Sequence, residues 1–184
     1  QSRFWENIVG RSLSFVQLIA PMIRKQVNFA NQVTEHELYL YFNNVKADYI
    51  RVDADEVTYN LHIALRYEIE KKIFGDELSV SEIPEYWNDR MEQLLGVRPT
   101  NDSQGVLQDT HWSSGLFGYF PTYTLGNLVS AIIASKMRKD LEDYEKDIKR
   151  GNFQPIREWL RLNIHQHGSA YAPKVLLKNT LNEG

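Results

Sequence analysis

Residues 53–75, DADEVTYNLHIALRYEIEKKIFG, decide the fold of this chain because they predict one long and largely buried helix. Asp53, with Glu56 three residues later, is expected to cap its start, and Gly75 is expected to end it. A helix that is apolar around much of its circumference packs against several neighbours, so this one is expected to be central. The apolar stripe consists of Val57, Leu61, Leu65, Ile69 and Ile73, widened by Tyr59, Ile63 and Tyr67.

The sequence on either side predicts further helices over residues 12–25, 81–95, 155–165 and 173–181. Another begins at Thr34, where Glu37 completes a capping-box pattern. Pro121 fits the first turn of a long helix that ends near Gly151. Its second half, Lys136 to Arg150, is heavily charged and is expected to project into solvent.

These patterns predict an all-α fold for residues 1–184, taken as a single helical region. They leave open a short two-stranded element near Tyr49–Val52 and Glu77–Val80.

Composition excludes several classes of function. Apolar residues make up 42% of the 184 residues, which is ordinary for a soluble domain, and a net charge of −3 offers no general basic field for nucleic acid. No apolar run reaches the roughly 18 residues that a membrane span requires. The chain has 0 cysteines, so disulfides and thiolate zinc sites are excluded, and a cytoplasmic location is expected.

Between Pro99 and Tyr119 the chain shows neither helical nor strand periodicity, yet it is rich in chemically active side chains. Ordering such a segment costs conformational entropy, and long aperiodic segments inside compact domains are usually functional. Its centre is residues 105–112, GVLQDTHW, in which Asp109 and Trp112 flank His111. The carboxylate is expected to raise the pKa of this imidazole, which acts either as a hydrogen-bond donor or as a general base.

Tyr119 and Tyr123 follow this segment, and a phenol at the start of a helix can donate a hydrogen bond to an oxyanion. Packing with a satisfied hydroxyl is the alternative for each. Arg51, flanked by Asp53 and Asp55, also allows two interpretations. The aspartates either cap a helix and hold Arg51 in a salt bridge, or orient its planar guanidinium toward a substrate carboxylate.

The histidines do not form a metal motif. His36-Glu37 is followed by Leu40 where the helical H-E-x-x-H motif needs its second histidine. His165 and His167 fit a helix C-terminus better than a zinc site, because no third ligand is near in the sequence. His62 lies within the central helix and faces either the site or the core.

Two patterns give the chain a resemblance to the thermostable carboxypeptidase Taq family of zinc metallocarboxypeptidases. One is [IV]-R-x-x-A-D, here Ile50 to Asp55, and the other is G-x-x-Q-D-x-H-W, here Gly105 to Trp112. The resemblance implies a zincin-like helical fold with a deep groove, an enzyme that removes single residues from peptide C-termini, and a homodimer. It also implies that Arg51 binds the peptide C-terminus, with Asp55, Asp109, Trp112 and Tyr119 on the substrate side, and that His111 and Tyr123 are catalytic.

In this family the zinc ligands are two histidines of H-E-x-x-H and a downstream glutamate, which lies in a His-Glu-Ser tripeptide. Residues 1–7 of this chain resemble the residues that follow that tripeptide. The resemblance therefore implies that this chain is the C-terminal portion of such an enzyme, truncated at both ends. It also implies that the chain lacks the zinc ligands and the general base and is catalytically inert alone. The alternative is a non-enzymatic helical binding or oligomerisation module. A portion cut from a larger protein is expected to expose an apolar face that self-association would cover.

Overall fold

The structure is a computed structural model that describes residues 2–27 and 31–181. These residues form helices, turns and irregular segments, and no strand occurs among them. The all-α prediction is thereby confirmed, and the two-stranded element is absent from the described part: a short 3₁₀ turn covers Arg51–Asp53 and another covers Val80–Glu82.

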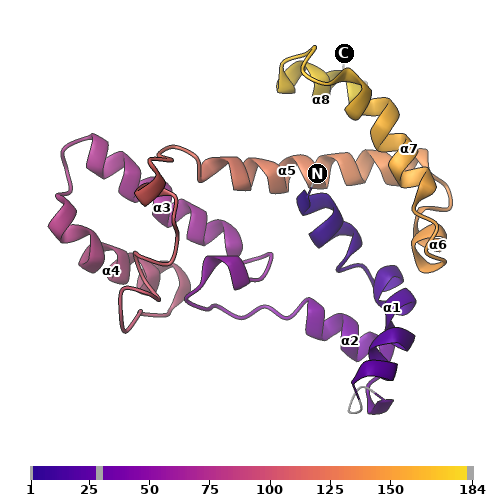
Figure 1. The fold of residues 1–184 in the computed structure, drawn as a ribbon, viewed down its shortest axis with the longest axis horizontal. Helices are drawn as coiled ribbons and strands as arrows, with labels where there is room; N and C mark the ends of the chain where they lie inside the picture. The colour runs from indigo at the N-terminus through magenta and orange to yellow at the C-terminus, as the bar shows by residue number, and fades with distance from the viewer. Residues whose placement is uncertain (1, 28–30, 182–184) are drawn as a thin grey trace. The chain divides into compact units, whose positions relative to one another are not determined.

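The chain divides into two compact units, residues 1–42 with 127–184, and residues 43–126 (Figure 1). The first unit begins with a π-helical segment, Phe4–Val9, and contains α1 Leu13–Gln26 and α2 Glu35–Phe42. Its remaining helices are most of α5 Pro121–Asp140, then α6 Tyr144–Lys149, α7 Gln154–Asn163 and α8 Pro173–Leu181. The second unit contains α3 Tyr59–Phe74, α4 Ile83–Leu95 and the first turns of α5.

Local signals place several helix ends as predicted. Thr34 and Glu37 form the reciprocal capping box: the Thr34 amide donates to Glu37 Oε2 at 2.8 Å, and the Glu37 amide donates to Thr34 Oγ1 at 3.2 Å. At the end of α4, Gly96 adopts a left-handed φ of 71°, which glycine reaches without steric cost.

The start of the central helix was predicted wrongly. Asp53 does not cap α3, whose N-cap is Thr58 without a side-chain cap. Asp55 instead stabilises the turn before the helix, because its Oδ1 accepts from the amides of Val57 and Thr58 at 2.8 and 2.9 Å. Regular helix then begins only at Tyr59. Two carboxylates two residues apart are equivalent as sequence signals, and the 3₁₀ turn at Arg51–Asp53 leaves Asp53 exposed.

The prediction of one helix over residues 121–151 also needs correction. The helix stops at Asp140 and a separate α6 follows. The charged stretch also contains three apolar residues that are buried rather than solvated, namely Met137, Tyr144 and Ile148. The break lets both helices bring these residues to one core, which consists of Phe4, Val9, Ile133, Ala134, Met137, Tyr144, Ile148, Ile156, Trp159 and Leu160.

In the second unit α3 packs side by side with α4 (Figure 1). Its core joins Leu65 and Ile69 of α3 to residues of α4, namely Ile83, Trp87, Met91 and Leu95. A second cluster, Ala54, Tyr59, Ile63 and Phe120, joins the start of α3 to the segment just before α5. The predicted central position of α3 within its own unit is confirmed, and it carries the site described below.

The burial of α6 predicts a stability effect. Replacing Ile148, which is 0% exposed, with alanine is expected to lower the free energy of unfolding by about 2–5 kcal/mol, because it leaves a cavity in the core. Urea denaturation followed by circular dichroism measures this. The adjacent and exposed Lys149→Ala is the control and should change stability by less than about 0.5 kcal/mol. Equal effects of the two substitutions would contradict the placement of α6.

Candidate functional site

The two sequence patterns meet in one buried ion cluster. Arg51 Nη2 lies 2.6 Å from Asp109 Oδ1, and Arg66 Nη2 of α3 lies 2.6 Å from Asp109 Oδ2. The side chains of Arg51, Arg66 and Asp109 are 7%, 0% and 10% exposed. Burial alone would raise the pKa of Asp109, but the hydrogen bonds and charges of the two guanidiniums hold it below its ordinary value. One carboxylate therefore forms ion pairs with both buried cations.

Gln108 completes this cluster through its side-chain amide. Its Oε1 accepts from the Arg51 amide and from Arg66 Nη2, both at 2.8 Å. Its Nε2 donates to the carbonyls of Tyr49 and Gln104 at 3.0 and 2.9 Å. The amide thus uses its acceptor and both donors, which fixes the segment around Arg51 against the segment around Asp109.

The predicted salt bridge between Arg51 and its flanking aspartates is wrong. The partner of Arg51 is Asp109, 58 residues away, and its Nη1 donates to Tyr59 Oη at 2.8 Å. Asp55 instead binds its own segment and the Lys46 amide, and the hydrogen bonds of Thr58, Lys46 and Val57 lower its pKa against the opposing effect of burial. Its predicted contact with substrate stays a prediction.

His111 lies in an aromatic setting beside this cluster. Its Nε2 is 2.9 Å from Tyr123 Oη, and its ring centroid is 4.3 Å from that of Phe120 and 5.8 Å from that of Tyr119. Burial lowers the pKa of His111, and although Asp109 raises it, Arg51 and Arg66 oppose that effect. The sequence predicts that the neighbouring carboxylate raises the pKa of His111. This prediction is wrong, because burial and the two guanidiniums that pair with Asp109 outweigh the effect of that carboxylate.

The neutral imidazole has a preferred tautomer. His111 Nδ1 is buried without a hydrogen-bond partner among the described residues and lies 3.9 Å from Asp109 Oδ1. A proton on Nδ1 faces that negative charge, so Nε2 is left as an acceptor for the Tyr123 hydroxyl. Burial raises the pKa of Tyr123, which keeps this phenol protonated and able to donate.

Side chains on successive turns of α3 attach the aperiodic segment to this helix. The backbone of the segment passes beside α3 (Figure 1). Arg66 binds Gln108 and Asp109. Four residues on, Glu70 accepts from Trp112 Nε1 at 2.8 Å and from the Gly118 amide at 3.1 Å. These links occur on one helical face, because residues four apart lie one above the other.

Two further contacts extend this attachment. Phe74, one turn beyond Glu70, packs edge to face against Phe117 with ring centroids 5.2 Å apart. Gly115 and Gly118 adopt positive φ values of 73° and 75°, which only glycine reaches readily, so the segment can turn back to α3 between its attachments.

Sequence reasoning missed Arg66, Glu70, Gln108 and Tyr59 as members of this site. A signal was present, because Arg66 and Glu70 interrupt the apolar stripe of α3 at helical spacing, and charged residues are seldom fully buried unless paired. The structure brings together Arg51, Asp109, His111 and the two tyrosines, with Trp112 attached through Glu70.

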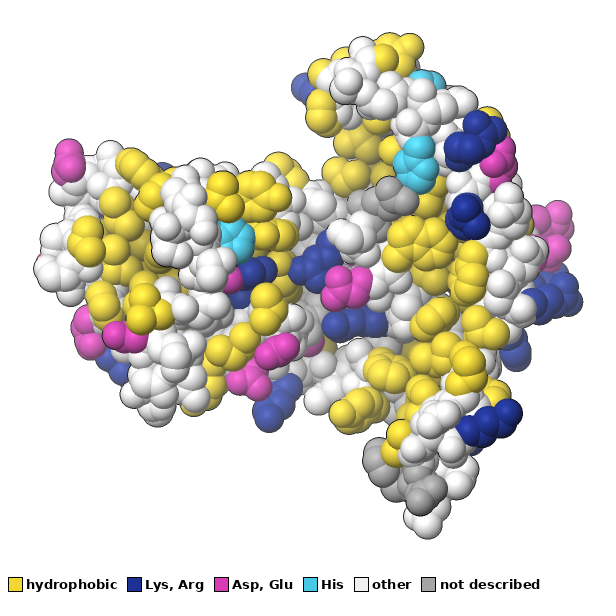
Figure 2. Space-filling model, viewed as in Figure 1, with side chains coloured by type: hydrophobic (Ala, Val, Ile, Leu, Met, Phe, Trp, Pro, Cys, Tyr) yellow, Lys and Arg dark blue, Asp and Glu magenta, His cyan; other side chains and the backbone are white. Residues whose placement is uncertain are grey.

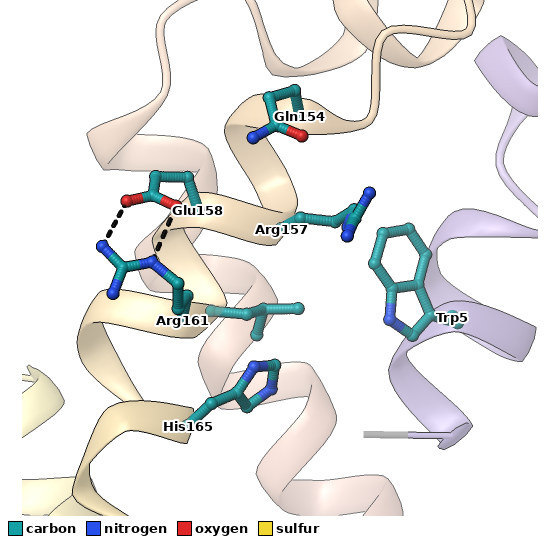
Figure 3. A pocket seen from close by; sticks show the side chains of 7 residues that line it. Trp5, Gln154, Arg157, Glu158, Arg161 and His165 are labelled. Atoms are coloured by element: carbon teal, nitrogen blue, oxygen red, sulfur yellow. Dashed lines mark hydrogen bonds and ion pairs between the residues drawn. The ribbon is translucent and has the colours of Figure 1, made fainter.

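The other histidines are not part of the histidine–tyrosine pair. His62 borders the ion cluster, because Arg66 Nη1 donates to its carbonyl at 2.7 Å, whereas His165 belongs to the first unit. His62 is buried in the core with both ring nitrogens unpartnered among the described residues. His165 borders a cavity of about 540 Å³ in the first unit, together with Trp5, Arg157 and the ion pair Arg161–Glu158 (Figure 3). None of the motif residues lines that cavity.

No group of three or more His, Asp or Glu side chains that could hold a metal ion occurs in the described ranges. The zinc that the resemblance implies therefore has no fitting site among those residues. No helix in that part of the chain is long and apolar enough to cross a membrane.

The protein is helical, and its site consists of a buried arginine–carboxylate cluster next to a histidine–tyrosine pair. Comparisons with known proteins identify the family. Residues 1–183 match the model of the carboxypeptidase Taq (M32) metallopeptidase family, and the chain belongs to that family. It is 50% identical to thermostable carboxypeptidase 1 of Pyrococcus furiosus over 183 residues, covering 100% of this chain and 37% of that protein.

Other relatives agree. The chain is 45% identical to thermostable carboxypeptidase 1 of Thermus thermophilus, of which it covers 36%. A solved structure of Pyrococcus furiosus carboxypeptidase superposes with a TM-score of 0.94 at 50% identity, covering 100% of this chain and 37% of that one. The chain thus spans a little over a third of the length of the curated relatives it matches, and these are carboxypeptidases rather than binding modules.

The ion cluster predicts a large effect of Asp109→Asn. The substitution leaves two buried guanidiniums without their counter-charge, so the free energy of unfolding should fall by about 3–5 kcal/mol in urea denaturation at pH 7. Asp89→Asn is the matched control, because Asp89 pairs with the more exposed Arg98 at 2.6 Å, and it should cost less than about 1 kcal/mol. The pKa of Asp109 is lowered in the folded chain, so its contribution to the free energy of unfolding is fully present above a pH of about 4. That contribution is lost as the pH falls through the pKa of Asp109 in the folded state.

The buried His62 predicts a second pH effect. Burial, then Arg66 and Arg51, lowers its pKa from 6.5 to about 4, so the unfolded chain binds more protons between these values. Stability should fall as pH drops from 6.5 to 4, with about 3 kcal/mol attributable to this group. Urea titrations at several pH values measure this dependence. The substitution His62→Leu should remove the part of the pH dependence that is due to His62, whereas His36→Leu, at an exposed position, should leave it unchanged. An unchanged slope in His62→Leu would refute this assignment.

Proposed function

We propose that this chain is the substrate-binding portion of a zinc-dependent carboxypeptidase that removes single residues from peptide C-termini. The observation that carries the proposal is the meeting of Arg51, Asp109, His111 and Tyr123 in one cluster, from segments far apart in the sequence. Family membership supports the class of reaction. We further propose that the zinc is bound by residues outside this chain, and that the chain alone is inert.

In this proposal Arg51 receives the terminal carboxylate of the peptide. A guanidinium has five N–H donors, and three of those of Arg51 bind Asp109 and Tyr59. Two donors, one on each Nη, have no partner among the described residues. Asp109 and Tyr59 hold the guanidinium in one orientation, which reduces the entropy lost when a carboxylate binds.

Tyr123 is the proposed donor to the scissile carbonyl. Its hydroxyl lies 2.9 Å from His111 Nε2, to which it would donate in the tautomer that has its proton on Nδ1. Rotation about the C–O bond would redirect the proton toward an oxyanion, and the neutral imidazole would then hold the phenol oxygen in place. Tyr119, whose ring is 5.5 Å from that of Tyr123 and 46% exposed, and Trp112 would border the bound peptide.

Self-association and a cytoplasmic location also stay proposals. Large apolar side chains are exposed on the described surface, among them Leu125, Leu128 and Ile132 of α5. Figure 2 shows hydrophobic side chains gathered on the visible face of both units. Contact with the remainder of a larger protein or with a second copy would remove this surface from water.

A peptidase assay tests the proposed function. The product of the complete reading frame should release the last residue of an N-blocked dipeptide and lose this activity to a chelator. It should reject the same dipeptide with a C-terminal amide, because the carboxylate that Arg51 binds is missing. In that protein Arg51→Lys should raise KM by about 10- to 100-fold, since a bidentate, charged hydrogen-bond pair is lost.

The 184-residue chain supplied with zinc is the control and should show no turnover. Turnover by this chain would refute its inertness. Absence of activity in the complete product, or equal cleavage of the acid and the amide, would refute the proposed function.

A further inference from the structure

Glu70 of α3 is a buried carboxylate that the proposed function does not use. It is 4% exposed, and both hydrogen bonds to its side chain come from one segment: Trp112 Nε1 donates to Oε1 and the Gly118 amide donates to Oε2. None of the ion pairs among the described residues includes it. A charge this deep would be costly without such donors, so the two N–H groups and the carboxylate fix one another.

The two donors lie at the two ends of the turn that joins His111, a proposed catalytic group, to Tyr119, which is proposed to border the substrate. Trp112 directly follows His111, and Gly118 directly precedes Tyr119. Within this turn the backbone bonds are local, such as Leu116 N to His111 O at 2.8 Å, and do not attach it to α3. Glu70 is therefore the polar link that holds both ends of the turn to the helix.

The positions of His111, Tyr119 and Tyr123 relative to one another depend on this link. The rings of His111 and Tyr119 lie 5.8 Å apart, and His111 Nε2 is 2.9 Å from Tyr123 Oη. Upstream, Asp109 is held by Arg66, one turn earlier on the same face of α3. His111 thus lies between two attachments to one rigid helix, and only one of these belongs to the arginine cluster.

From this arrangement we propose that Glu70 is a positioning residue, which sets the orientation of His111 and Tyr119 through Trp112 and Gly118. The inference rests on the proposed function for its catalytic consequence. It adds a residue outside both sequence motifs. It also separates two roles on α3: Arg66 balances charge, whereas Glu70 fixes the segment that follows.

The test compares Glu70→Gln with Glu68→Gln. The glutamine has nearly the same shape, but its amide group places a donor against one of the two N–H donors. Glu68, two residues earlier on the same helix, pairs with Arg90 at 2.8 Å and is partly exposed, so it is a matched control. Amide hydrogen exchange of the 184-residue chain is measured first. We expect Gly118 to exchange about tenfold faster in Glu70→Gln, since a hydrogen bond to a charged acceptor is lost, and to be unchanged in Glu68→Gln.

Kinetics of the product of the complete reading frame provide the second measurement. Glu70→Gln should lower kcat by about 10- to 100-fold with a smaller change in KM, because misplaced reacting groups slow the chemical step more than binding. Glu68→Gln should stay within about twofold. Trp112→Phe removes one donor only, so Glu70→Gln should cost less in that background than in the wild type.

The outcomes separate the two proposals. If Gly118 exchange is unchanged, or if it accelerates while kcat stays as in Glu68→Gln, Glu70 is not a positioning residue. If Glu70→Gln does not fold, the comparison moves to Trp112→Phe, whose kcat must then fall relative to Glu68→Gln. If the wild-type product cleaves no peptide, the proposed function fails, and the exchange measurement still decides whether Glu70 holds the turn.

Discussion

The structure of the second unit depends on a single carboxylate placed between two buried guanidiniums. Asp109 joins Arg51, from the segment before α3, to Arg66 on α3 itself. Two buried cations would repel one another and lose hydration, so neither can occupy its position without this counter-charge. The cluster also decides the state of His111, because the guanidiniums leave little of the Asp109 charge to stabilise a protonated imidazole.

Helix α3 converts this local chemistry into an ordered site. One face places His62, Arg66, Glu70 and Phe74 at intervals of four residues. The last three contact successive parts of the segment from Gln108 to Gly118. A segment with no regular structure thereby takes its conformation from a helix, and its entropic cost is offset by charged hydrogen bonds and ring packing. The adjacent face of the helix, with Leu65 and Ile69, packs into the apolar core with α4.

Much of the fold could be predicted from the sequence. The capping box at Thr34, the left-handed Gly96 and the apolar period of α3 are local signals, and local geometry determines their outcome. The errors occurred where local signals were equivalent or incomplete. Asp53 and Asp55 are equal candidates for a cap in the sequence, but Asp53 lies in a 3₁₀ turn, Asp55 stabilises the turn before the helix, and α3 begins only after Thr58. The break after Asp140 follows from the burial of Tyr144 and Ile148 in a core that distant residues complete.

For the site, the sequence by itself determined which residue types stand together in each segment, and the two patterns were enough to indicate the family. Only the tertiary structure decided which charges pair: Arg51 with Asp109 instead of its neighbours, and Trp112 with Glu70. The physical reason is range. Capping and periodicity act over a few residues, whereas the pairing of charges depends on which side chains are buried together, and that is fixed only when the whole unit packs.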